Sequence, residues 1–348
     1  MSQIEKRTIR NTGLDVTVLG MGGAGLAGMY TSFDEATAAE TIRAGYESGI
    51  RFFDTAPQYG FGRSEMVMGS VLRTLDRDSF VLSTKVGRVL VDAPEREGTD
   101  FGAFSDLPAK FDQLDYSRDG IMRSVEDSLE RLGMDRIDVL LIHDPHPADW
   151  NDIKHQIVNE AYPAVEELRS QGVGRAIGAG LNNNEKFLYM AERGDYDCVL
   201  IALCYNLIDY SALDELLPMC EKRNIGVYHG GPYSSGILAS DPNVESELGT
   251  RHWYGKAPPE VVDKARKLKA VCDRYDTPLK AVALQFGLAH PAVVSTVPGP
   301  RNPGEAQENV AMALFPTPAD LWEELKAEGL IPEAAPVPPL ASTDPSTD

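Results

Sequence analysis

The sequence predicts an α/β fold, specifically a (β/α)8 TIM barrel with an N-terminal hairpin and long loops at the carboxyl ends of the strands. Eight short apolar runs are each followed by a helical pattern, which is typical of parallel strands joined by crossover helices. Several runs end in a polar residue, as barrel strands do on the face that carries chemistry. The same alternation also fits a doubly wound open sheet, which stays the alternative architecture.

The chain opens with a segment that fits a small hairpin. Lys6–Val18 can turn at Asn11-Thr12-Gly13, because asparagine and glycine adopt the backbone angles of tight turns. The first barrel strand is expected at Val18–Gly22. The first helix is expected to begin after Asp34, a favourable N-cap residue, and to end at Gly49, because glycine commonly terminates helices.

The other strands and helices follow in alternation. The remaining strands share runs of mainly apolar residues, and we expect them at Ile50–Asp54, Phe80–Lys85, Ile137–His143, Ala176–Ala179, Cys198–Ala202, Ile225–Tyr228 and Val293–Val297. The remaining helices share apolar residues at helical spacing, and we expect them at Ser64–Leu75, Gly120–Leu132, Ile153–Gln171, Asn184–Arg193, Ser211–Lys222, Pro259–Tyr275 and Gly304–Met312.

Two connections exceed the usual loop length. Val86–Ser117 and Gly230–Pro258 contain several prolines and glycines without a regular pattern, and both follow the carboxyl end of a predicted strand. Long loops in a compact domain are often lids over a binding site, and we expect both to be lids. Residues 1–330 are expected to form a single domain, and the Pro-, Ser- and Asp-rich tail Ile331–Asp348 is expected to be disordered.

The composition restricts the class of partner. A net charge of −20 argues against nucleic acid and anionic membranes as partners, because both are negatively charged. No apolar run is long enough for a membrane helix, and the N-terminus MSQIEKRTIR lacks the apolar centre of a signal peptide. The four cysteines have no metal-binding or disulfide spacing, so we expect a protein of the reducing cytoplasm. The oligomeric state stays open.

Four polar residues close or follow predicted strands. Asp54, Lys85 and His143 end three of the strands, and Tyr59 lies in the loop after the first of these. Taken singly, each has an ordinary structural explanation as a helix cap, an ion-pair partner, a turn aromatic or a buried histidine. Together they supply a carboxylate, a phenol, an ammonium and an imidazole, which form a set for proton transfer. The sequence therefore predicts an enzyme with these four catalytic residues.

The expected chemistry centres on the phenol of Tyr59. A free tyrosine has a pKa of about 10, which is high for proton release near neutrality. The ammonium of Lys85 is expected to favour the phenolate, and Asp54 is expected to keep that lysine charged and oriented. His143 would donate a hydrogen bond to a carbonyl or alcohol oxygen. Such a set suits the movement of a proton on oxygen while a hydride moves on carbon.

The segments FFDTAPQYGFGRSE, STK and LLIHDP resemble the aldo-keto reductase superfamily, whose Asp, Tyr, Lys and His tetrad falls on the same four residues in this order. The resemblance covers about residues 7–315, and the segments GGPYSSGIL and PLKAVALQFGLAHPAVVSTVPGPRNPGEAQEN resemble its sugar-oxidising branch. It implies an NAD(P)-dependent oxidoreductase that oxidises an aldose of the L-fucose, L-galactose or D-arabinose type at C1 to its lactone. A non-sugar aldehyde such as pyridoxal stays open as the substrate.

The resemblance also implies contacts with the nicotinamide cofactor. The matching positions lie in loops after the strands, and they are Gly22, Gly23, Asn182, Ser234, Ser235, Gly236, Leu238, Gly299, Arg301, Glu308 and Asn309. The chain departs from the family pattern at Gly180-Leu181, Ala202 and Gly230, where residues that usually contact the nicotinamide are missing. Gly299 and Glu305 stand where basic residues usually bind the 2′-phosphate, so NAD is favoured and NADP stays open.

Trp253 and Tyr254 in the second long loop, together with Gln58 beside Tyr59, are the candidate substrate residues. Aromatic rings can stack on a sugar, although a loop aromatic that pins the lid to the barrel is an equal explanation. Gly20–Gly25 fits G-x-G-x-x-G, but no helix follows it directly. The dinucleotide fingerprint of an open sheet is therefore not indicated.

Two further hypotheses concern single residues of the tetrad. His143 and His146 form an H-x-x-H pattern, but prolines flank them and no third ligand recurs nearby, so no metal is expected. Lys85 at a strand end also fits a Schiff-base aldolase. Outside catalysis, a regulatory subunit that binds a nicotinamide nucleotide stays open as well.

Overall fold

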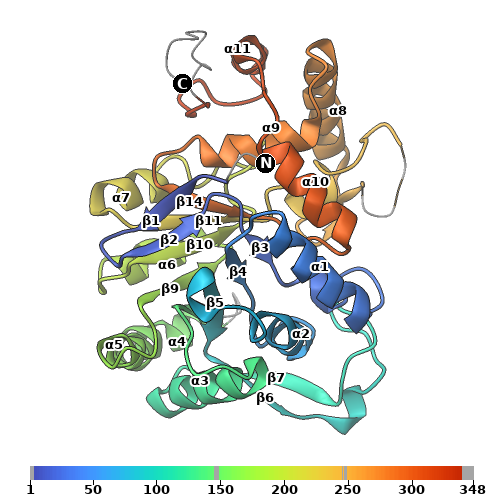
Figure 1. Cartoon of the computed structure of the whole chain (residues 1–348). Coiled ribbons are helices and arrows are strands. Elements are labelled where there is room, and N and C mark those ends of the chain that lie inside the picture. The colour runs from blue at the N-terminus through green and yellow to red at the C-terminus, as the bar shows by residue number, and fades with distance from the viewer. Residues whose placement is uncertain (1–3, 145–148, 245, 247–248, 339–348) are drawn as a thin grey trace.

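A computed structural model describes residues 4–144, 149–244, 246 and 249–338 of the chain. Its centre is a parallel sheet of eight strands in the spatial order β3-β4-β5-β8-β9-β10-β11-β14. The two ends of this sheet meet, because Leu19 forms a parallel bridge with Thr296 and the Gly22 amide donates to the Pro298 carbonyl at 2.9 Å. The sheet is therefore closed, and the predicted (β/α)8 barrel is confirmed over the open sheet (Figure 1).

The barrel strands agree with the predicted apolar runs to within a few residues. They are β3 Met21–Gly22, β4 Phe52–Asp54, β5 Val81–Val86, β8 Val139–His143, β9 Ala176–Leu181, β10 Cys198–Ala202, β11 Gly226–Gly230 and β14 Val293–Val297. Almost every residue in them is buried, as expected for parallel strands covered on both faces. The polar residues at the ends of these strands are therefore not explained by packing in the apolar core.

The predicted N-terminal hairpin is present as β1 (Lys6–Ile9) and β2 (Leu14–Thr17), paired antiparallel. Ile9, Leu14 and Val16 are almost fully buried, and they cluster with the first residues of several barrel strands, including Val81 and Val139. The hairpin thus closes the amino-terminal end of the barrel. The carboxyl-terminal end is left as the face on which a site can form.

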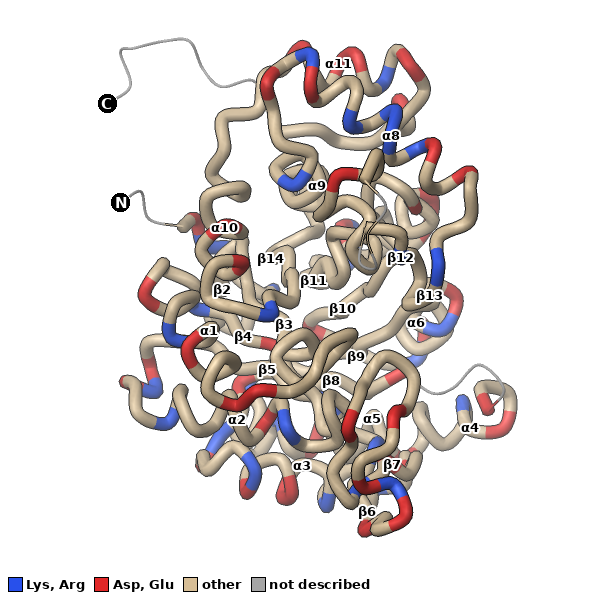
Figure 2. Tube along the Cα trace, turned by 90° about the vertical axis from the view of Figure 1, so that its right-hand side faces the viewer, with Lys and Arg blue, Asp and Glu red and all other residues tan. Residues whose placement is uncertain are grey.

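Helices surround the barrel (Figure 1). They are α1 Glu35–Glu47, α2 Arg63–Leu72, α3 Arg118–Leu132, α4 Trp150–Gln156, α5 Tyr162–Ser170, α6 Asn184–Ala191, α7 Leu216–Arg223, α8 Pro259–Arg274, α9 Leu279–Leu288, α10 Pro303–Ala313 and α11 Ala319–Ala327. A π-helical turn at Ile157–Ala161 joins α4 to α5 where the sequence predicted one helix. Charged residues lie along the helices and loops, whereas β9, β10 and β11 contain no Lys, Arg, Asp or Glu (Figure 2).

Two helices differ from the sequence prediction. The pattern indicated no separate helix at α9, and none at α11. Most residues of α9 are buried and apolar, with Lys280 and Gln285 as its polar residues, so the 3.6-residue period that identifies a surface helix is weak. The helix α9 packs against β14, while α8 lies outside it in contact with α11.

Both long loops contain a hairpin that the sequence pattern did not indicate. In the first, β6 (Arg88–Asp92) pairs antiparallel with β7 (Lys110–Leu114). In the second, β12 (Arg251–His252) pairs with β13 (Gly255–Lys256). The first hairpin begins one residue after β5 ends, so it extends directly from the face of the barrel where the strands have their carboxyl ends.

The expected disordered tail is packed in its first part. Ile331 and Ala335 are 2% and 1% exposed and belong to the main apolar cluster, while residues 339–348 lie outside the described residues. The four cysteines are unpaired and buried, as expected of small apolar residues. In the part of the chain that the structure describes, no helix is long and apolar enough to cross a membrane.

Candidate active site

Three neighbouring strands bring the predicted tetrad together. Asp54 is the last residue of β4, Lys85 lies at the end of β5, and His143 is the last residue of β8. The strands pair in the order β4-β5-β8, so these side chains meet at one edge of the barrel. Tyr59 lies in the turn between β4 and α2, which returns its ring to the same place.

Lys85 and Asp54 form an ion pair inside the barrel mouth. The Lys85 ammonium donates to Asp54 Oδ2 at 2.7 Å and to the Thr55 carbonyl at 2.9 Å. The two side chains are only 1% and 3% exposed. Burial alone lowers the pKa of Lys85, but the negative charge of Asp54 and the nearby Tyr59 outweigh burial and hold this pKa above its usual value. Lys85 is therefore a fixed ammonium at neutral pH.

The ring of Tyr59 lies beside both Lys85 and His143. The Lys85 ammonium is 4.6 Å from the ring centroid of Tyr59. The rings of Tyr59 and His143 are 6.2 Å apart at an angle of 88°. The expectation that Lys85 makes this phenol unusually acidic is wrong for the structure as it stands. Burial raises the pKa of Tyr59 by more than the charge of Lys85 lowers it, so the pKa lies above its ordinary value.

His143 is a neutral imidazole. Its side chain is buried, and burial together with the charges of Arg88 and Lys85 lowers its pKa well below the ordinary value. Two buried atoms of the tetrad, His143 Nδ1 and Asp54 Oδ1, have no hydrogen-bond partner among the described residues. Buried polar atoms without partners are uncommon, and at a pocket they indicate positions that a ligand or water satisfies. Asp54 lines the pocket described next, whereas His143 is not part of that lining.

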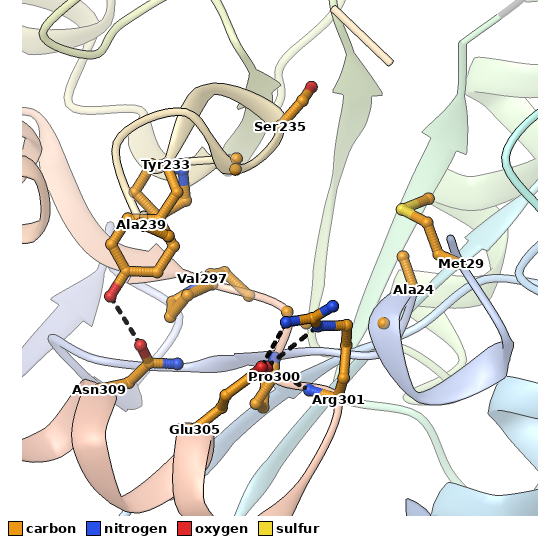
Figure 3. A pocket seen from close by; sticks show the side chains of 18 of the residues that line it. Ala24, Met29, Tyr233, Ser235, Ala239, Val297, Pro300, Arg301, Glu305 and Asn309 are labelled. Atoms are coloured by element: carbon orange, nitrogen blue, oxygen red, sulfur yellow. Dashed lines mark hydrogen bonds and ion pairs between the residues drawn. The ribbon is translucent and has the colours of Figure 1, made fainter. Parts of the chain in front are cut away.

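A pocket of about 260 Å³ extends from Tyr59 and Asp54 toward α10. Its lining includes six glycines from the ends of β3 and β11 and from the loops after β3, β11 and β14: Gly22, Gly25, Gly230, Gly231, Gly236 and Gly299. These loops pack closely, since a Cβ added at Gly25 would lie 2.8 Å from the Gly299 carbonyl oxygen. Figure 3 shows Ala24 and Met29 on one side of this pocket and Tyr233, Ser235 and Ala239 on the other.

The end of the pocket near α10 is rich in paired charges. The Arg301 guanidinium donates to both oxygens of Glu305, with the shorter contact at 2.5 Å (Figure 3). The Lys280 ammonium donates to Glu308 at 2.6 Å. The Tyr233 hydroxyl donates to Asn309 Oδ1 at 2.6 Å (Figure 3). Among the described residues, the two cations that line this end of the pocket, Arg301 and Lys280, therefore each already have a carboxylate partner.

Most of the predicted cofactor residues line this pocket, and four do not. Those in the lining are Gly22, Ser235, Gly236, Gly299, Arg301, Glu308 and Asn309. Gly23 lies against the α2 side instead, where a Cβ would come within 2.3 Å of Ser64 Oγ. Ser234 and Leu238 are fully buried, and Ser234 Oγ hydrogen-bonds His252 Nδ1 at 2.7 Å. Asn182 lies next to Asp144, which accepts a hydrogen bond from its amide.

The predicted substrate residues are only partly at the pocket. Tyr254 lines it, whereas Trp253 is 39% exposed and is not part of the lining, nor is Gln58. The lining also contains Tyr30, Tyr233 and Lys280, which the sequence analysis did not single out. Tyr233 belongs to the segment GGPYSSGIL, which resembles the family and contains four of the expected cofactor residues, so the sequence does carry a signal for it; nothing in the pattern marks Tyr30 or Lys280.

No group of three or more histidine, cysteine, aspartate or glutamate side chains suited to a metal ion occurs among the described residues. The second histidine of the H-x-x-H pattern, His146, lies outside them.

Comparison with known proteins agrees with this geometry. The profile of the aldo/keto reductase family matches residues 18–328. The chain is 37% identical over 344 residues to a pyridoxal 4-dehydrogenase of Microbacterium luteolum, with 94% of this chain and 98% of that protein covered. It is 36% identical to a D-threo-aldose 1-dehydrogenase of a Pseudomonas species, with 92% and 96% covered. An L-galactose dehydrogenase of Arabidopsis thaliana is 31% identical, with 89% and 88% covered.

Solved structures share the same fold. An aldo-keto reductase from Bacillus halodurans superposes with a TM-score of 0.72 at 24% identity, covering 98% of this chain and 99% of that one. A glycerol dehydrogenase from Gluconobacter oxydans gives a TM-score of 0.71 at 21% identity, with 99% of both chains covered. The chain belongs to the aldo/keto reductase family, whose members are NAD(P)-dependent oxidoreductases.

Proposed function

We propose that this protein is an NAD-dependent dehydrogenase that oxidises the C1 hydroxyl of an aldose to a lactone, with Tyr59 as the proton acceptor. The observation that carries the proposal is the convergence of Tyr59, His143 and a dry Lys85–Asp54 ion pair at one end of a glycine-lined pocket. Two of the relatives named above carry aldose or L-galactose in their names, which supports a sugar as substrate.

The pocket fits a nicotinamide dinucleotide. The backbone is left-handed at Ser235 and Gly236, with φ of 64° and 123°, within the loop that follows β11. Loops of this kind can turn N–H groups toward an anion, which suits a pyrophosphate. The Gly236 N–H itself donates to the Tyr233 carbonyl at 2.9 Å. The glycines let the backbone approach a flat ligand closely. When bound, the nicotinamide ring accepts or supplies the hydride.

The tetrad supplies the proton chemistry. In oxidation, Tyr59 acts as the phenolate: it takes the proton of the substrate hydroxyl and becomes a phenol, and the ammonium of Lys85 stabilises the phenolate that precedes this transfer. Asp54 holds Lys85 in its charged form and in place. His143 is neutral, so one ring nitrogen can donate a hydrogen bond to the substrate oxygen without adding a charge next to Lys85. Reduction of an aldehyde uses the same groups in reverse, with Tyr59 donating.

The preference for NAD over NADP follows from the paired charges near α10. A 2′-phosphate needs a cation that is free to meet it. Arg301 is held by Glu305, and Lys280 by Glu308. A phosphate placed there would have to break one of these pairs and would face two carboxylates, whereas ribose hydroxyls could donate to them.

Pyridoxal is the second candidate substrate. It is supported by the relative of that name and by the aromatic character of the wall near Tyr59. The ring of Phe104, which is not part of the pocket lining, lies 6.5 Å from that of Tyr59 at an angle of 29°. Tyr30 and Tyr254 also line the pocket. Such a wall can pack against a flat pyridine ring as well as against the apolar face of a sugar.

The Schiff-base alternative has little support. Lys85 is 1% exposed and ion-paired, and its pKa is raised, whereas a nucleophilic lysine has to be present as the free amine.

Initial rates with NAD and with NADP across L-fucose, L-galactose, D-arabinose and pyridoxal test the proposal. We expect NADH to form faster with an aldose than with pyridoxal and faster with NAD than with NADP. Tyr59→Phe should lose at least about 1000-fold in kcat while it still binds NADH in a fluorescence titration. Near-normal turnover by Tyr59→Phe would refute the mechanism. Binding of NADH without turnover of any aldehyde or alcohol would favour a regulatory protein instead.

A further inference from the structure

The carboxyl end of β8 has a support that the tetrad does not include. The pairing of β5 with β8 ends at Val86 opposite Ile142, one residue before His143. At Gly87 the chain turns away into β6 with φ of +93°. The carbonyls of His143 and Asp144 therefore continue beyond the last paired residue of β5, and buried carbonyls need hydrogen-bond donors.

Two side chains from the β6–β7 hairpin region supply those donors. The Tyr116 hydroxyl donates to the His143 carbonyl at 2.7 Å. The Arg88 guanidinium donates from Nη2 to the Asp144 carbonyl, also at 2.7 Å. Burial raises the pKa of Tyr116, so this hydroxyl keeps its proton and acts as a donor at any physiological pH. Consecutive carbonyls at the catalytic end of β8 are thus each held by a side chain from the same long loop.

Both donors are themselves fixed in place. Tyr116 is 1% exposed and packs against Gly87, where an added Cβ would lie 2.5 Å from the tyrosine ring. Arg88 is paired through Nη1 with Asp112 of β7, and the two side chains are 13% and 5% exposed. A rigid planar guanidinium that bonds a carboxylate on one side and a carbonyl on the other fixes their relative orientation. A lysine ammonium cannot do this, because it has no planar pair of donors.

We propose that Tyr116 and Arg88 are positioning residues, which hold the end of β8 so that the imidazole of His143 faces Tyr59 and the substrate oxygen. The inference rests on the proposed function, because it assigns the role through His143. In this proposal the first long loop supports a catalytic residue. The sequence pattern predicts a lid here, which would only cover the pocket. Neither residue touches the substrate in this account.

The test is a double-mutant cycle with His143→Ala. Tyr116→Phe removes one hydroxyl and leaves the ring against Gly87, and Arg88→Met removes the fork with little loss of volume. We expect each to lower kcat on the order of 10- to 100-fold, with KM and the Kd for NADH changed by less than about 3-fold. In the His143→Ala background the same changes should lower kcat by less than about 3-fold further, because the group they position is absent.

The chain offers matched controls. Arg77 spans the same two strands at their opposite end, where it donates to Asp138 at 2.7 Å with side-chain exposures of 19% and 2%. The Tyr210 hydroxyl donates to the Leu330 carbonyl and accepts from the Lys264 ammonium, and neither partner belongs to the tetrad. Arg77→Met and Tyr210→Phe should lower Tm by amounts similar to Arg88→Met and Tyr116→Phe, yet keep kcat within about 3-fold of the unmodified enzyme.

The outcomes separate the inference from the proposed function. If Tyr116→Phe and Arg88→Met lower kcat by the same factor with and without His143, they act as structural residues and the inference is wrong, although the tetrad stands. If His143→Ala itself keeps near-normal turnover, the role of His143 in the proposed function is wrong. If Arg88→Met does not fold, Arg88→Lys takes its place, and an unchanged kcat in that variant would contradict the need for the guanidinium fork.

Discussion

Replacement of Lys85 by methionine leaves the Asp54 carboxylate inside the barrel mouth without its counter-ion. The two side chains are 1% and 3% exposed, with 2.7 Å between Nζ and Oδ2, so water cannot take the place of the lost charge. Removal of one partner from a buried ion pair costs about 3–5 kcal/mol. A chain of 348 residues unfolds with an entropy of about 0.7 kcal/mol/K, so we expect Tm to fall by about 4–7 °C.

The size of this loss should depend on pH. Burial raises the pKa of Asp54, and the charge of Lys85 opposes that rise, so loss of the lysine raises the pKa further. A carboxyl group whose folded-state pKa is raised contributes its stability fully below its unfolded pKa, and this contribution is lost as pH rises through the folded pKa. Lys85→Met should therefore be only slightly less stable than the unmodified protein near about pH 5, and fully destabilised near about pH 8.

Thermal unfolding followed by circular dichroism at both pH values measures the effect. The double variant Asp54→Asn/Lys85→Met has neither charge, and we expect it to regain most of the lost Tm while it remains inactive. That combination would mean that the ion pair is present for catalysis, with little net contribution to stability. A Lys85→Met protein with unchanged Tm at about pH 8, or a double variant as unstable as the single one, would refute the reasoning.

Three further predictions follow from other charged groups. Glu305→Gln removes the carboxylate that holds Arg301, so we expect NADPH to bind about 5- to 20-fold more tightly. Fluorescence titrations with NADPH and with NADH measure this change. Unchanged NADPH affinity would count against the role of Glu305. Because burial raises the pKa of Tyr59, kcat/KM for oxidation should rise about tenfold per pH unit between about pH 6 and 9, and a flat profile would contradict Tyr59 as the base. Arg131 donates at 2.6 Å to Glu65, which is 0% exposed, so Arg131→Met should cost about 3–5 kcal/mol of stability with little change in KM; calorimetry and kinetics on the same protein check both statements.

The convergence of Asp54, Lys85 and His143 could be predicted from the sequence because the ends of apolar strands can be recognised in it. Asp54, Lys85 and His143 each interrupt an apolar run at its carboxyl end, and parallel strands bring those ends to one face whatever the details of packing. The order of the barrel strands adds no further uncertainty, because neighbouring strands in a barrel are successive in the chain. The positions of these residues therefore follow from topology alone.

The pocket wall was harder to predict, because loop conformation decides it. Tyr30 reaches the pocket through a backbone with φ of 64°, and Trp253 and Tyr254 are both left-handed in the turn between β12 and β13. No local pattern predicts such angles for aromatic residues, which pay a steric cost to adopt them. Lys280 lies on α9, a helix whose apolar sequence hid its period. Tyr30 and Lys280 were therefore not predicted, whereas Tyr254 and most of the expected cofactor residues do line the pocket.

The predicted direction of the Tyr59 pKa shift was wrong for a related reason. The charged neighbours of a residue can be inferred from sequence motifs. How deeply the residue is buried depends instead on the packing of every side chain around the site. The dry surroundings that raise the pKa of Tyr59 also strengthen the action of the Lys85 charge upon it, since Coulomb interactions grow as the dielectric constant falls. At neutral pH Tyr59 is a protonated phenol, ready to donate to a carbonyl oxygen, and it must first lose its proton to accept one from an alcohol. In the proposed mechanism the geometry therefore serves both directions of the reaction, and we expect a rise in pH to shift the balance from aldehyde reduction toward alcohol oxidation.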